Sequence, residues 1–105
     1  MIGNRTQEII DAIGITNFIE LYTLFNATWP VEIKKLQHTN ERKLALHKLK
    51  GNCYSVGLDL IGKHIESVED ILDHGAESTA REHFSLLIKE IELEQDNIKQ
   101  LIARY

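Results

Sequence analysis

One short segment of the sequence, His47-Lys48-Leu49-Lys50-Gly51, places a nucleophile, a cation and a glycine within one helical turn. The apolar residues around it recur three and four positions apart, which predicts the buried side of a helix: Leu46, Leu49, Cys53 and Val56. At about 100° per residue, His47, Lys50 and Gly51 fall together on the opposite side. The pattern therefore predicts an exposed imidazole with an ammonium group and a bare patch of backbone one turn away.

These residue types suit phosphoryl transfer. A neutral imidazole nitrogen is a competent nucleophile toward phosphorus, and such a transfer needs mainly in-line positioning and neutralisation of the equatorial oxygens. Lys50 can supply part of that positive charge as a mobile point charge. A glycine inside a helix costs about 0.5–1 kcal/mol relative to alanine, and no turn is needed at Gly51. We therefore expect Gly51 to admit the close approach of another molecule.

The segment from His47 to Gly51, followed by Gly57 ten residues after the histidine, resembles the signature of histidine-containing phosphotransfer domains. It is most similar to the C-terminal phosphotransfer domains of tripartite hybrid sensor kinases. The resemblance implies that His47 accepts a phosphoryl group from a receiver-domain aspartate and returns it to another receiver. It also implies that Lys50 steadies the phosphate and that Gly51 admits the receiver.

The same resemblance implies the partners and cofactors. Response-regulator receiver domains and a hybrid sensor kinase are the expected partners, and the receiver brings the Mg²⁺ ion. The chain then needs no metal, no nucleotide site and no other cofactor of its own. Whether such a phosphotransfer intermediate counts as an enzyme stays open.

Three further residues are candidates for the receiver-docking surface. Tyr54 lies on the same face as His47, where many members of the family carry alanine or glycine, so it could narrow the choice of receiver. Alternatively, its side chain swings aside and packs along its own helix. Leu24 and Val31 point away from the core stripe of a long second helix and could form the apolar part of the docking surface. Alternatively, the first helix covers them with its isoleucines.

The predicted fold class is all-α, because apolar residues recur at helical spacing throughout and no alternating apolar pattern occurs. Thr16, either Thr39 or Asn40, and Asp59 are expected to cap three of the helices, and a capping box begins at Thr79, within or at the start of the last helix. Short connections make neighbouring helices antiparallel, so we expect an up-down-up-down four-helix bundle with a short extra N-terminal helix covering one end. The predicted helices span residues 6–13, 16–37, 40–56, 59–75 and 79–104.

Length and composition limit the chain to one soluble domain over residues 1–105. The formal net charge of −4 offers no basic surface to a nucleic acid. No apolar stretch reaches the ~18 residues that a membrane helix needs, and the single cysteine fits a reducing compartment. We therefore expect a cytoplasmic monomer without direct membrane contact, either free or as the cytosolic end of a membrane-anchored sensor kinase.

Other interpretations of the sequence are weaker. Residues 57–63 have the spacing of a nucleotide-binding loop, but no strand precedes them and His64 follows where Ser or Thr is required. A metal-binding bundle needs Glu-x-x-His, and no histidine here has an acidic residue three positions before it. The remaining alternative is a helical adaptor that binds a receiver or kinase through the same face without using His47. The other histidines are expected to be surface residues without a role: His38, His64, His74 and His83.

Overall fold

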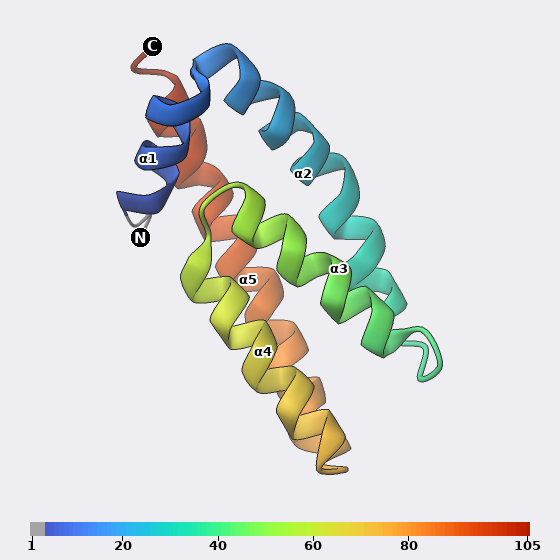
Figure 1. Cartoon of the computed structure of the whole chain (residues 1–105). Coiled ribbons are helices and arrows are strands. Elements are labelled where there is room, and N and C mark those ends of the chain that lie inside the picture. Colours follow the sequence, from blue (N-terminus) through green and yellow to red (C-terminus); the bar gives the residue numbers. More distant parts are fainter. Residues whose placement is uncertain (1–3) are drawn as a thin grey trace.

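A computed structural model describes residues 4–105 of the chain (Figure 1). Its helices are α1 (Asn4–Ile13), α2 (Ile15–Lys35), α3 (Arg42–Ser55), α4 (Asp59–Asp73) and α5 (Glu77–Ile102). No strand occurs among these residues, so the predicted all-α fold class is confirmed. None of the described helices is long and apolar enough to span a bilayer.

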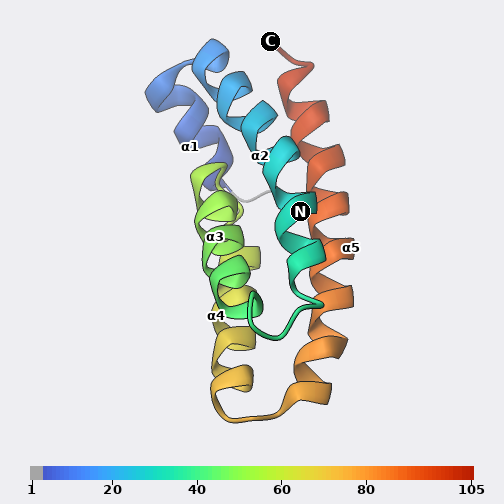
Figure 2. The ribbon, with the colours of Figure 1, turned by 90° about the vertical axis from the view of Figure 1, so that its right-hand side faces the viewer.

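The helices form an elongated body of 44 × 21 × 20 Å. Helix α3 packs against both α2 and α4, and α4 packs in turn against α5. Figures 1 and 2 show α1 at the end of the body where α2 begins and α5 ends. A hydrogen bond of 2.6 Å from Gln7 to the hydroxyl of Tyr105 joins α1 to the C-terminal end.

Glycines follow three of the helices closely. Gly14, Gly57 and Gly75 have φ values of 86°, 84° and 79°, which glycine adopts without strain. Gly57 also lies under α1, because a Cβ placed there would come within 2.6 Å of the backbone nitrogen of Thr6. The hydroxyl of Thr6 donates to the carbonyl of Val56 at 2.9 Å, so α1 is fastened over the turn between α3 and α4.

The expected side-chain caps are wrong. Thr16 and Asp59 lie inside α2 and α4, Glu41 and not Thr39 or Asn40 precedes α3, and no side-chain cap hydrogen bond occurs at the start of these helices. Thr79 lies inside α5, which is one of the two positions expected for it. Helices α2, α4 and α5 begin earlier, because the carbonyl of the residue before each of them already accepts the first intrahelical bond. The carbonyl of Gly14, for instance, accepts from the amide of Phe18 at 3.0 Å.

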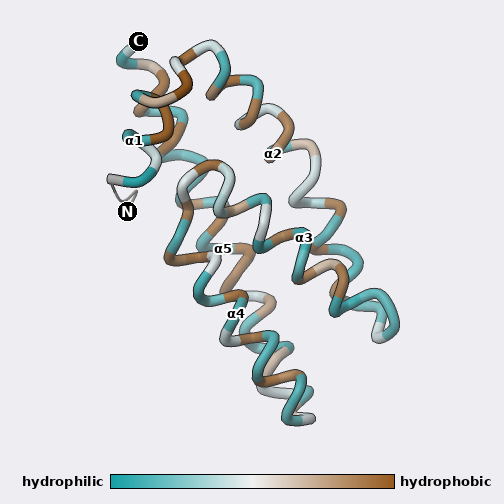
Figure 3. Tube along the Cα trace, viewed as in Figure 1, coloured by the Kyte–Doolittle hydropathy of each residue, from teal (hydrophilic) through white to brown (hydrophobic). Residues whose placement is uncertain are grey.

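One apolar core runs through the body. Figure 3 shows its hydrophobic positions recurring along the helices. Cys53 belongs to this core and is fully buried, and burial raises the pKa of its thiol to about 12. The thiol therefore stays protonated at neutral pH. The largest fully buried apolar side chains are Phe18, Phe25, Leu36, Leu46, Leu49, Ile65, Leu87, Ile91 and Ile98.

A buried arginine ties the turn after α2 to the start of α5. The Nε atom of Arg42 donates to the carbonyl of Leu36 at 2.8 Å, and its Nη1 atom pairs with the carboxylate of Glu77 at 2.5 Å. Its guanidinium group also lies 5.4 Å from the ring centre of Phe84. A charge this deeply buried needs such partners, because an unpaired buried charge is strongly destabilising.

This ion pair predicts a pH-dependent stability. The hydrogen bond from Arg42 lowers the pKa of Glu77 below its ordinary value of 4.5. A carboxyl group with a lowered pKa in the folded state stabilises that state above its unfolded pKa, and the effect is lost as pH falls. Glu77→Gln should therefore unfold a few degrees below wild type at pH 7 in a thermal melt, and the difference should shrink below about pH 4.5.

Glu82→Gln is the matched control, because Glu82 is an exposed glutamate on the same helix. This variant should melt like the wild type at both pH values. A deficit in Glu77→Gln that stays constant into acid would contradict an ionic role for the carboxylate.

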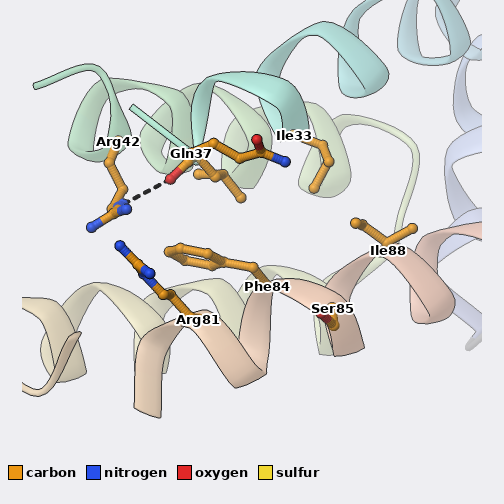
Figure 4. Close-up of a pocket in the computed structure, with 8 residues that line it drawn as sticks. Ile33, Gln37, Arg42, Arg81, Phe84, Ser85 and Ile88 are labelled. Atoms are coloured by element: carbon orange, nitrogen blue, oxygen red, sulfur yellow. Dashed lines mark hydrogen bonds between the residues drawn. The ribbon is translucent and has the colours of Figure 1, made fainter. Parts of the chain in front are cut away.

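Near the same arginine, α2 and α5 leave an open cavity of about 400 Å³ (Figure 4). Figure 4 shows the guanidinium groups of Arg42 and Arg81 at one end of it, the ring of Phe84 beside that of Arg81, and Ile88 farther along α5. Phe84 and Ile88 are consequently only half-buried. This cavity lies between α2 and α5, whereas His47 lies on α3.

Candidate functional site

The site predicted from the sequence lies on the outer side of α3. Leu46, Leu49 and Cys53 are fully buried, whereas His47 and Gly51 are exposed. A Cβ added at Gly51 would meet no atom within 4 Å, so the backbone beside the imidazole is open to solvent. The helical spacing thus placed the histidine and the glycine correctly.

Lys50 is one turn from His47, but its ammonium group is already hydrogen-bonded to another side chain. Its Nζ atom donates to Oε1 of Glu69 on α4 at 2.8 Å, and both side chains are about three-quarters buried, with exposed fractions of 23% and 26%. This hydrogen bond raises the pKa of Lys50 above its usual value, so the ammonium group stays charged at neutral pH. Glu69 was not expected from the sequence, because nothing in the local pattern of α3 indicates which residue of α4 faces it.

Two further polar contacts extend along the seam between α3 and α4. Lys43 pairs with Asp73 at 3.2 Å, and the hydroxyl of Tyr54 donates to Oε1 of Glu66 at 2.9 Å. Together with Glu69, these acidic residues recur along one face of α4. The carboxylates of α4 therefore line one side of the candidate site.

Tyr54 leans toward α4. The hydrogen bond to Glu66 raises the pKa of its hydroxyl above the usual value. A Cβ placed at Gly62 would come within 2.5 Å of the tyrosine ring, so this glycine makes room for it. The side chain thus swings aside, as one of the two expectations had it, but it packs across the seam instead of along its own helix.

Leu24 and Val31 remain on the surface of α2, with exposed fractions of 60% and 52%. The alternative that α1 covers them is wrong, because Ile10, the buried isoleucine of α1, joins the core. On α2, Thr28 lies between the two residues and accepts a hydrogen bond from Asn52 at 3.1 Å. Since Asn52 follows Gly51 in α3, the apolar pair lies on the part of α2 next to the open glycine.

The other histidines differ from one another. His38 and His74 are exposed, and the Nδ1 atom of His74 bonds only to the carbonyl of Asp70 in its own helix. His64 of α4 and His83 of α5 are partly buried and bonded to each other. These two histidines are therefore not simply the exposed surface residues expected from the sequence.

The geometry of the site can support nucleophilic chemistry at His47. The imidazole has no hydrogen-bond partner among the described residues, so its nitrogens are available to a partner molecule. Lys50 brings a cation, Gly51 leaves the backbone open, and Leu24 with Val31 adds exposed apolar surface. No protein-family model, no curated protein and no solved structure matches this chain.

Proposed function

We propose that this chain is a histidine-containing phosphotransfer domain that carries a phosphoryl group on His47 between receiver-domain aspartates. The observation that carries this proposal is an exposed imidazole one turn from an ammonium group and from open backbone at Gly51. A second protein can press a phosphorylated side chain against such a surface without meeting a side chain at Gly51. The proposed fold is the antiparallel up-down-up-down four-helix bundle expected from the sequence.

The proposed transfer is a simple displacement at phosphorus. A lone pair on one nitrogen of neutral His47 attacks the phosphorus of an aspartyl phosphate, and an N–P bond forms. The P–O bond to the aspartate breaks, and the receiver regains its carboxylate. The imidazole ring becomes positively charged and can release the proton on its other nitrogen to solvent. The return transfer to a second receiver reverses these steps.

Lys50 acts on the phosphoryl oxygens in this proposal. An ammonium group has three N–H donors, and one of them is used by Glu69 in the unphosphorylated chain. A phosphoryl group on His47 would compete with Glu69 for this cation, because it carries more negative charge than a carboxylate. Lys50 is thus held near the site by Glu69 before the phosphoryl group arrives.

Leu24 and Val31 are proposed as the apolar part of the receiver-docking surface. Tyr54 is proposed to lie at its edge, because its ring leans toward α4. In this proposal the receiver supplies the Mg²⁺ ion, and the chain works in the cytoplasm with a hybrid sensor kinase and response regulators. No nucleic acid and no membrane takes part.

The test is incubation of the chain with a set of receiver domains phosphorylated at their aspartates in the presence of Mg²⁺. Label should appear on the chain, and it should be lost in acid and survive alkali, as a phosphohistidine does. Binding to a receiver without any label would support the adaptor in place of the relay. Absence of both binding and label across the set would overturn the proposal.

Lys50→Ala should keep the fold but lower the fraction of chain that carries the phosphoryl group, or the lifetime of that group, several-fold. The expected cause is the loss of a charge-assisted contact to the phosphoryl oxygens. The fraction and its decay can be followed by phosphate-affinity electrophoresis. Lys48→Ala is the matched control, because Lys48 is exposed on the same helix and has no hydrogen bond or ion pair within the described part of the chain. If the phosphorylated fraction falls equally in both variants, Lys50 contributes only to the general positive charge of α3 and makes no specific contact to the phosphoryl group.

Glu69→Gln should act in the opposite direction. Its amide can still hydrogen-bond Lys50 but no longer holds the ammonium group by charge, and a carboxylate that repels the phosphoryl group is gone. The phosphorylated fraction at equilibrium with a given receiver should rise about two- to fivefold, since screened charges of this kind contribute modestly. A fall in that fraction would mean that Glu69 is needed to hold Lys50 in position.

A further inference from the structure

The seam between α4 and α5 contains a chain of three hydrogen-bonded side chains that the phosphotransfer proposal does not use. The Nδ1 atom of His64 contacts both carboxylate oxygens of Glu90, with the longer contact at 3.0 Å. The Nε2 atom of His64 lies 2.7 Å from Nδ1 of His83, and the two rings meet edge to face. His64 and His83 come from different helices, so this contact links α4 to α5.

The hydrogen-bond partners of the two imidazole rings indicate which ring nitrogens carry hydrogen. Because a carboxylate accepts at Nδ1 of His64, the hydrogen of the neutral ring belongs on that nitrogen. Its Nε2 atom then presents a lone pair toward His83. A carboxylate on the far ring nitrogen is also what orients most histidines that bind metals and makes them more basic. His64 thus has the hydrogen-bond arrangement that metal-binding histidines usually show.

We propose that His64 and His83 bind a divalent transition metal ion such as Zn²⁺, Cu²⁺ or Ni²⁺, with Glu90 as the residue that orients His64. Two imidazole ligands at about 2.0–2.1 Å in a tetrahedral site lie about 3.3 Å apart. The two nitrogens are now 2.7 Å apart, so this separation has to increase by about 0.6 Å and both rings have to turn their lone pairs toward the ion. The hydrogen on Nδ1 of His83 moves to the other ring nitrogen or leaves to solvent as the metal binds.

The chemistry of the ligands sets the class of ion. Imidazole suits Zn²⁺, Cu²⁺ and Ni²⁺, whereas Mg²⁺ and Ca²⁺ require oxygen ligands. Among residues 4–105, no group of three or more histidine, cysteine or acidic residues is placed to hold one ion. The site therefore has two protein ligands and takes water at its remaining positions. The bound ion would brace α4 against α5, away from His47 on α3.

The test is a titration of the full chain, free of any affinity tag, with Zn²⁺ alone and with Mg²⁺ as the comparison ion. Zn²⁺ should raise the melting temperature and bind with one-to-one stoichiometry in calorimetry, and Mg²⁺ should do neither. His64→Gln and His83→Gln should each lower the affinity for Zn²⁺ at least tenfold. Glu90→Gln should lower it by about 10–100-fold, as expected for a residue that orients a ligand.

Matched controls separate this site from ordinary surface histidines. His38→Gln and His74→Gln remove the same kind of side chain at exposed positions and should leave Zn²⁺ binding unchanged. Ring resonances in the NMR spectrum of the wild type supply a readout without any variant, because Zn²⁺ should shift those of His64 and His83 first. Absence of Zn²⁺ binding in the wild type would overturn the proposal, and so would wild-type affinity for Zn²⁺ in both His64→Gln and His83→Gln. The pair would then be a structural link between α4 and α5.

Discussion

His47→Gln should take up no phosphoryl group from any phosphorylated receiver while folding as the wild type does. The imidazole is exposed and makes no hydrogen bond within residues 4–105, and glutamine is a good helix former, so the substitution removes the nucleophile and little else. No label above background is expected after electrophoresis under alkaline conditions. The helical circular dichroism signal and the melting temperature should match those of the wild type.

His38→Gln is the control for this result, because it removes another exposed imidazole just before α3 begins. Transfer to this variant should proceed at the wild-type rate. Alkali-stable, acid-labile label that persists on His47→Gln would place the phosphoryl group on another histidine. If His47→Gln still binds the receiver as tightly as the wild type, the loss of label is due to the missing nucleophile and not to weaker docking.

The arrangement of α3 could be predicted because it depends on local periodicity. Four buried apolar positions fix which side of the helix faces the core, and His47, Lys50 and Gly51 then take their places without any knowledge of the other helices. Gly14, Gly57 and Gly75 after the ends of helices are local signals of the same kind, because a turn with positive φ favours glycine whatever lies around it. The helix starts were less predictable, because no side-chain cap hydrogen bond marks where α2, α4 and α5 begin.

Contacts between helices could not be predicted in the same way. The pairing of Lys50 with Glu69 and of Tyr54 with Glu66 depends on how far α4 slides along α3. That register follows from the packing of two apolar faces, and the polar sequence at the seam does not encode it. For Glu69 the only signal was its recurrence with other acidic residues on one face of α4.

The histidine pair illustrates the same limit. His64 and His83 are 19 residues apart and lie on different helices, so neither has a local pattern that indicates its partner. A search for Glu-x-x-His motifs finds only residues that are close together on one helix, so it misses two histidines that meet from different helices. The exposed Leu24 and Val31 posed a related question, because the direction of α1 decides whether they are covered. The turn at Gly14 directs α1 away from these two residues, so both stay exposed.

Gly51→Gln should abolish or strongly slow transfer and at the same time stabilise the isolated chain. Apart from the neighbouring backbone of α3, no atom lies within 4 Å of a Cβ added at this position, so the new side chain begins in open space. Replacing a helical glycine by a good helix former should stabilise the fold by about 0.5–1 kcal/mol. The same side chain would occupy the open backbone one turn from His47 that the receiver is proposed to approach. Transfer from a phosphorylated receiver should fall at least tenfold, and the denaturation midpoint should rise.

Gly51→Ala separates the two effects, because it gives most of the helical stabilisation with only a methyl group at the surface. Its midpoint should rise like that of Gly51→Gln, whereas its transfer rate should stay close to that of the wild type. A transfer rate that falls with glutamine but not with alanine therefore indicates that the larger side chain excludes the partner sterically. If Gly51→Gln transfers as fast as the wild type, receivers do not approach over this glycine. The helical glycine would then need an explanation within the chain, which the empty space around its added Cβ does not offer.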